Sequence, residues 1–164
     1  MMTLLEEKLI PYVGVGDIKL LSSLFDVKTF LKRNNINFTT DFQSNKGCNP
    51  EVPWIILHIA NSITLSFAND KLWSIYCEEK FAGSLPNGIK IGMTMDEAMK
   101  IDSSLEFDEL NEDYKSSLGY WLEDDLDTNT VMSITIFIKE VLNNDQFFNY
   151  KWWYILKSLS IGYF

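Results

Sequence analysis

In residues 63–77, ITLSFANDKLWSIYC, apolar and polar side chains alternate over 63–67, and an apolar-rich run at 72–77 follows a central Asn69-Asp70. Alternation with a period of two is typical of a strand that buries one face. Asn and Asp tolerate the backbone of a tight turn, so this dipeptide indicates a reversal of the chain. The stretch therefore predicts two antiparallel strands, at 63–67 and 72–77.

Runs of the same kind lie on both sides of this hairpin. Strands joined by such short turns are typical of an antiparallel meander. The further predicted strands are 36–42, 54–60, 114–122 and 131–141, with an acidic turn at 124–129 between the last two and an exposed loop at 44–53.

The chain also contains a weak internal repeat, in which residues 18–28 (IKLLSSLFDVK) align with residues 89–99 (IKIGMTMDEAM). Each copy places a hydroxyl residue, Ser23 or Thr94, three positions before an acid, as in a helix N-cap. Helices are predicted at 24–34 and 95–102. We therefore expect a single α+β domain over 1–164, with antiparallel sheet, a few short helices and two similar halves at 16–80 and 87–142.

The negative charge is gathered in one stretch. The net charge is −9, and ten acids between Asp102 and Asp127 are opposed there by Lys115 alone. Such a segment attracts cations, polyamines and basic proteins, and it repels nucleic acid. The alternative interpretation is a solvated face that keeps the protein in solution.

The sequence lacks the residue sets of recognisable catalysis. His58 is the single histidine, no nucleophile motif lies beside it, and with Cys48 and Cys77 it makes no zinc set. The pattern that begins at Gly14-Val15-Gly16 does not continue as a phosphate loop. We expect no enzyme activity, no cofactor and no metal, and we expect His58 to be a core or sheet-edge residue with partners.

Two kinds of carboxylate chemistry stay open. Glycoside hydrolysis needs a pair of acids, which Glu123 with Asp125, or Asp108 with Glu112, would supply. The oxygens of residues 124–129 would suit calcium, although the glycine and terminal glutamate of an EF-hand are missing.

The N-terminal residues MMTLLEEK carry acids where a signal peptide has a basic region, and no apolar run approaches the length of a membrane span. We expect a cytoplasmic protein without membrane contact, with Cys48 and Cys77 as reduced thiols.

Residues 85–97, LPNGIKIGMTMDE, have the order of a short strand, a turn and a capped helix. With the meander 58–76 before them and the acidic hairpin 119–127 after them, they resemble immunity proteins of bacterial contact-dependent growth inhibition and related polymorphic toxin systems. The resemblance implies a cytoplasmic protein without catalytic residues that neutralises a cognate toxin by occupying its active site or blocking its substrate path.

Nuclease toxins bind a polyanion and tend to be basic, so the acidic segment is the predicted contact for such a partner. The alternatives are an adaptor or chaperone subunit that docks through the aromatic tail after Phe147, predicted as a short helix across the sheet, and a small hydrolase. The candidate toxin-binding residues are Glu106, Asp108, Glu109, Glu112, Asp113, Tyr120, Trp121, Glu123, Asp124, Asp125 and Asp127.

Overall fold

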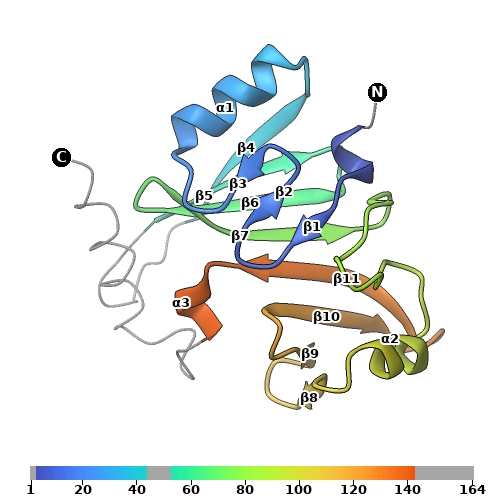
Figure 1. Ribbon diagram of the computed structural model, residues 1–164. Coiled ribbons are helices and arrows are strands. Elements are labelled where there is room, and N and C mark those ends of the chain that lie inside the picture. Colours follow the sequence, from blue (N-terminus) through green and yellow to red (C-terminus); the bar gives the residue numbers. More distant parts are fainter. Residues whose placement is uncertain (1–2, 44–52, 143–164) are drawn as a thin grey trace.

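The computed structural model describes residues 3–43 and 53–142 (Figure 1). It contains a three-stranded and an eight-stranded antiparallel sheet together with short helices, so the predicted α+β class is confirmed. The predicted loop 44–53 lies outside the described residues except for Pro53, and Cys48 and the aromatic tail after Phe147 lie wholly outside them.

The large sheet has the order β4-β5-β6-β7-β11-β10-β9-β8, and all its neighbouring strands are antiparallel. Its strands are β4 Phe38–Gln43, β5 Trp54–Ile59, β6 Ile63–Ala68, β7 Lys71–Glu78, β8 Glu106–Asp108, β9 Asp113–Lys115, β10 Tyr120–Asp125 and β11 Thr130–Phe137.

The sheet consists of two four-stranded meanders, each preceded by a helix. Helix α1 (Leu24–Arg33) precedes β4–β7, and helix α2 (Met95–Ile101) precedes β8–β11. The two meanders join through their last strands, where Ile75 of β7 pairs with Ile136 of β11. The centre of the sheet is therefore built from segments far apart in the sequence.

Both predicted N-caps are confirmed. Ser23 Oγ accepts the Asp26 N–H at 3.0 Å, and Thr94 Oγ1 accepts the Glu97 N–H at 3.2 Å. Glu97 returns the contact by accepting the Thr94 N–H at 3.2 Å, which completes a capping box. Each helix therefore starts where its hydroxyl residue satisfies a backbone donor that the helix itself leaves unpaired.

The turn between β6 and β7 is also as predicted. Asn69 and Asp70 have φ angles of 48° and 60°, the left-handed geometry that Asn and Asp tolerate. Asp70 Oδ1 in addition accepts the Leu24 N–H of α1 at 3.0 Å. One turn thus reverses the hairpin and holds the first helix against it.

The faces of the large sheet differ in polarity, as two neighbouring rows of cross-strand pairs show. The apolar row is Phe107, Tyr114, Leu122, Ile134, Cys77, Ile63, Ile59 and Phe38, from β8 to β4. The next row, on the opposite face, is Glu106, Lys115, Trp121, Thr135, Tyr76, Thr64, His58 and Thr39. The first row faces the core, and we call the second side the polar face.

The small sheet covers the apolar face (Figure 1). Its strands are β1 Leu9–Ile10, β2 Gly14–Val15 and β3 Ile18–Lys19, and they follow the short 3₁₀ helix η1 (Leu4–Glu6). Leu9, Val15 and Ile18 are at most 1% exposed and belong to the same core cluster as the central strands.

The predicted strand 114–122 is wrong in its bounds. The chain forms β9, reverses over residues 116–119, and only then forms β10. Gly119 has a φ of +97°, and its bare Cα lies under the ring of Tyr12. The contact that stabilises this reversal comes from the N-terminal segment, so local periodicity did not reveal it.

The acidic turn is shorter than predicted, because Asp124 and Asp125 belong to β10 and the chain turns over residues 126–129. A bulge between Glu123 and Asp124 shifts the register there. The predicted strand 131–141 ends at Phe137, and α3 (Lys139–Leu142) follows.

Residues 85–91 are not a strand, in contrast to the pattern expected for residues 85–97. Leu85 and Ile89 are instead buried, at 1% and 0% exposure. The following residues run along β11, where the Gly92 N–H donates to the Val131 carbonyl at 2.8 Å. The segment thereby places α2 beside the start of β11.

Candidate functional site

The acidic residues gather at one end of the large sheet. Strands β8 and β10 run in the same direction, because each is antiparallel to β9. The turns that follow them, residues 109–112 and 126–129, therefore lie at the same end. We call these two turns the acidic tips.

Most of the candidate acids at this end are accessible. Glu109, Glu112 and Asp127 are exposed there, and Asp124 and Asp125 are half-buried; Glu106 is also exposed, but it lies at the other end of β8. Each acidic tip also carries an apolar residue that is almost fully in water: Leu110 is 89% exposed and Leu126 is 88% exposed. These are the two most exposed large apolar side chains among the described residues.

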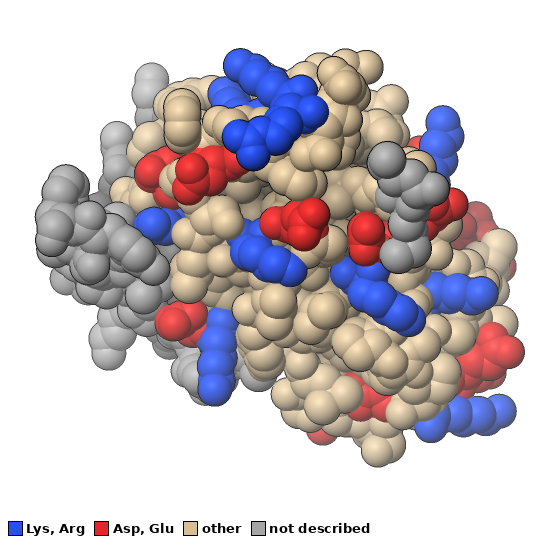
Figure 2. All heavy atoms as spheres, turned by 45° about the horizontal axis from the view of Figure 1, so that its top comes forward, with Lys and Arg blue, Asp and Glu red and all other residues tan. Residues whose placement is uncertain are grey.

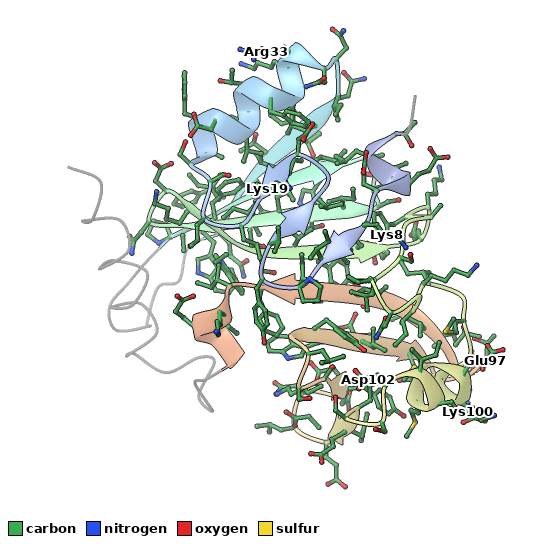
Figure 3. All side chains as sticks on the ribbon, in the orientation of Figure 1. Lys8, Lys19, Arg33, Glu97, Lys100 and Asp102 are labelled. Atoms are coloured by element: carbon green, nitrogen blue, oxygen red, sulfur yellow. The ribbon has the colours of Figure 1, made fainter. Side chains whose placement is uncertain are left out.

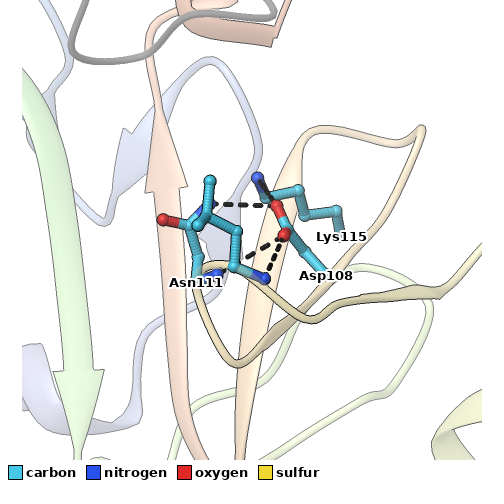
Figure 4. Close-up of polar contacts among 4 residues, drawn as sticks. Asp108, Asn111 and Lys115 are labelled. Carbon is cyan, nitrogen blue, oxygen red and sulfur yellow. Dashed lines mark hydrogen bonds and ion pairs between the residues drawn. The ribbon is translucent and has the colours of Figure 1, made fainter.

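The lone base of the acidic segment is already engaged. The Lys115 ammonium contacts Asp108 Oδ2, which also accepts from Asn111 Nδ2 at 2.9 Å (Figure 4). These two hydrogen bonds hold the pKa of Asp108 well below its usual range. Asp108 and Lys115 thus stabilise the β8–β9 hairpin and leave the other acids uncompensated.

Asp125 also has a structural role, because its Oδ1 accepts the backbone N–H groups of Asp127 at 2.9 Å and Thr128 at 3.3 Å. Such contacts are typical of an Asx-turn. Asp108 and Asp125, one from each carboxylate pair considered for hydrolysis, therefore hold the conformation of the acidic tips.

The polar face contains a cavity of about 320 Å³ between the two meanders. Trp54, Trp73 and Trp121 line it together with Tyr76, Asp113 and Glu123. Trp54 and Trp73 meet edge to face, with ring centroids 5.1 Å apart. A bulge opposite Ser66 and Phe67 brings Trp73 to the cavity beside Ser74.

Glu123 lies in this cavity at the centre of a hydrogen-bond network. Its Oε2 accepts from Ser133 Oγ at 2.5 Å and lies 3.1 Å from the Tyr76 hydroxyl. The same hydroxyl lies 3.0 Å from Glu78 Oε2, so its single proton serves one carboxylate at a time. Burial raises the pKa of Tyr76, which keeps the hydroxyl protonated as a donor.

Asp113 is the most constrained acid of the cavity. Asp113 is 8% exposed, and its Oδ1 has no hydrogen-bond partner among the described residues. Burial raises the pKa of Asp113 to about 6, with smaller contributions from the charges of Asp108 and Glu123. Lys115 opposes this rise without cancelling it.

Tyr120 does not belong to this surface, in contrast to our expectation. It is 1% exposed on the apolar side, where its hydroxyl donates to Asp102 Oδ2 and accepts from Asn87 Nδ2 at 3.2 Å. Asp102 also accepts from Ser116 Oγ at 2.5 Å and Ser104 Oγ at 2.7 Å. The network joins the C-terminal end of α2, where Figure 3 shows Asp102, to β9 and β10.

Burial favours the neutral form of Asp102, but the hydrogen bonds from Ser116, Tyr120 and Ser104 outweigh it and hold its pKa below the usual range. The carboxylate is thus a charged structural group with neutral donors around it.

The remaining reactive residues have structural surroundings. His58 on β5 contacts Asp41 Oδ2 through Nε2 at 2.9 Å and Thr64 Oγ1 through Nδ1 at 3.3 Å, so the expected partners are present. The residue is half-buried and β5 lies between β4 and β6, so its predicted place in the core or at a sheet edge is wrong. Cys77 is a buried free thiol, and burial raises its pKa. Within residues 3–43 and 53–142, no three His, Cys, Asp or Glu residues are placed to hold a metal ion.

The face that carries α1 differs in charge from the acidic end. On the face that carries α1, acidic and basic side chains are intermixed (Figure 2). None of the helices in the described part of the chain combines the length and apolar character needed to cross a membrane.

The structure therefore brings most of the predicted acids together and adds residues that the sequence reasoning missed. Tyr76, Glu78 and Ser133 share the polar face with Glu123. Their alternation with apolar residues along β7 and β11 was visible in the sequence, but the pairing of those two strands was not. No protein-family description, curated protein or solved structure matches this chain.

Proposed function

We propose that this chain is an inhibitor that binds a basic protein domain through the acidic tips, in the way that an immunity protein neutralises its cognate toxin. One observation carries the proposal: two acidic turns, each with an exposed leucine at its tip, lie at the same end of one sheet.

Charge and apolar contact have different tasks in such a complex. Uncompensated carboxylates accelerate encounter with a basic surface, while buried apolar side chains slow dissociation. A solvated acidic face accounts for Glu109, Glu112 and Asp127, but it leaves the exposure of Leu110 and Leu126 without a role. A nuclease domain that binds a polyanion is the partner class whose charge this end complements best.

The test starts from the product of the neighbouring gene, which we expect to be a basic protein that co-purifies with this chain. Stopped-flow association of the pair should slow at least severalfold for Glu109→Gln/Asp127→Asn at low salt. The difference from wild type should shrink toward 1 M salt, where the Debye length is about 3 Å. Both side chains are exposed, so folding stability should stay within about 0.5 kcal/mol of wild type.

Asp17→Asn/Asp26→Asn is the matched control, because it removes the same charge from exposed acids elsewhere on the molecule. Its association rate should stay close to that of wild type. If the two double variants slow association equally, the acidic tips act only through the net charge of the protein. If association rates are unchanged and independent of salt, the tips are not part of the interface. Leu110→Ser/Leu126→Ser should mainly increase the dissociation rate.

A further inference from the structure

The cavity on the polar face has the composition of a cation site. It combines three tryptophans, the carboxylates of Asp113 and Glu123 and one base, Lys115, in a volume of about 320 Å³, which lies at the lower end of the range of small-molecule sites. Aromatic rings and carboxylates both favour an organic cation over an anion or a neutral group.

Lys115 also lines the cavity, with its ammonium 5.3 Å from the centroid of the Trp121 ring, but it forms no ion pair with Asp113 or Glu123. Glu123 is held by neutral hydroxyl donors, and the ammonium of Lys115 is bound to Asp108. Asp113 is more than nine-tenths buried, it lines the cavity, and its Oδ1 has no hydrogen-bond partner among the described residues. A buried carboxylate oxygen without a donor is costly, and a bound N–H group would remove that cost.

We infer that this cavity binds a guanidinium or ammonium group, and that the group is the end of an arginine or lysine side chain of the basic partner. The identity of the source rests on the proposed function, whereas the cation site itself does not. The bound group donates to Asp113 Oδ1 and is enclosed by the tryptophan-lined wall. A side chain anchored there lies close to the acidic tips, because Asp113 begins the strand that follows the first tip.

The site can be tested with a small probe on the full-length protein. N-acetyl-arginine methylamide represents an arginine side chain within a protein, and N-acetyl-citrulline methylamide is its neutral analogue of nearly the same shape. Tryptophan fluorescence and amide chemical shifts should report saturable binding of the arginine probe and at least tenfold weaker binding of the citrulline probe. Equal binding of the two would overturn the inference.

Spermidine distinguishes the two sources of the cation. Binding of spermidine much more tightly than the arginine probe would assign the cavity to a free polyamine and would overturn the assignment to a partner side chain. Binding of the arginine probe at least as tightly as spermidine supports the partner side chain.

Asp113→Asn should weaken binding of the arginine probe at least tenfold, while Asp26→Asn, which removes the same charge from an exposed acid away from the acidic tips, should leave the affinity unchanged. Thr135→Lys supplies an independent variant, since Thr135 lines the cavity and a lysine there would add a second ammonium beside that of Lys115. Wild-type probe affinity in both Asp113→Asn and Thr135→Lys would contradict the site.

The two proposals fail in different ways. If the probe binds in a way that depends on Asp113 but no basic protein associates with the chain, the cation site is supported and the proposed function is contradicted. If a basic protein associates in a way that depends on Glu109 and Asp127 but the probe does not bind, the proposed function is supported and the cation site is contradicted.

Discussion

The hydroxyl of Tyr120 donates a hydrogen bond to Asp102 Oδ2, and this contact ties strand β10 to the residue that ends helix α2. Both residues are buried, Tyr120 at 1% and Asp102 at 5% exposure. The pair therefore anchors the second helix of the chain to the strand that leads to the second acidic tip.

Replacement of Tyr120 by Phe should lower the free energy of unfolding by about 1–3 kcal/mol, because it removes a donor from a buried carboxylate. Tyr114→Phe is the control, since Tyr114 is half-buried and lies on the neighbouring strand β9. Urea unfolding at pH 7 measures both. Equal losses would show that the Tyr120 hydroxyl contributes nothing specific.

Alanine substitutions at Gly119 and Gly88 distinguish the cost of backbone strain from the cost of a steric clash. Both have left-handed φ angles, +97° and +94°, but a Cβ at Gly119 would lie 2.3 Å from Tyr12 Cζ, whereas one at Gly88 would meet nothing within 4 Å. Gly88→Ala should cost about 1–2 kcal/mol from strain, and Gly119→Ala should cost a further ~1–3 kcal/mol from overpacking. Thermal unfolding of the two variants tests the order, and a smaller loss at Gly119 would contradict the Tyr12 contact.

The two helix caps should have similar energetic weight. Ser23→Ala and Thr94→Ala should each cost about 1 kcal/mol of stability, because each leaves a helix N–H without its acceptor. Thr128→Ala and Thr130→Ala should cost less, since these two hydroxyls contact only each other among the described residues, where the turn meets the first residue of β11, and neither caps a helix. Denaturant unfolding of the four variants distinguishes the sites, and four equal losses would contradict the capping role.

Asp113 should make the protein less stable as the pH rises. Its folded pKa is raised from 3.8 to about 6, so the protonated form is favoured on folding. The stability linked to Asp113 is present below pH 4 and is lost as the pH rises through about 6, by up to about 3 kcal/mol for a shift of about two pKa units. The charges that face it are those of Asp108 on β8, Glu123 on β10 and Lys115 on its own strand.

Asp113→Asn should remove this part of the pH dependence and should stabilise the protein at pH 7. Urea unfolding of wild type and variant between pH 4 and 8 gives the difference in their free energies of unfolding. The contributions of the other titrating acids are common to both proteins and cancel in this difference. Asp127→Asn, which removes one charge from an exposed acid, is measured over the same pH range as the control for the loss of a negative charge. A stability difference between wild type and Asp113→Asn that stays constant with pH would show that Asp113 titrates as an ordinary surface acid.

The sequence by itself determined the elements whose signals are local. Alternation over residues 63–67 and the Asn69-Asp70 turn specified the central hairpin, and the hydroxyl-to-acid spacing at Ser23 and Thr94 specified both helix starts. These signals are readable because side-chain period and capping act within a few residues of the chain. The concentration of acids between Asp102 and Asp127 was equally plain.

The tertiary structure decided which of these elements meet. Strand β7 pairs with β11, so Tyr76 and Glu123 share one cavity although 47 residues separate them. The same pairing buries Asp113 below the acidic tips, and Tyr12 packs on Gly119 to split the expected strand 114–122 in two. The burial of a carboxylate depends on neighbours from distant segments, and its pKa depends on that burial. A local sequence pattern does not identify those neighbours.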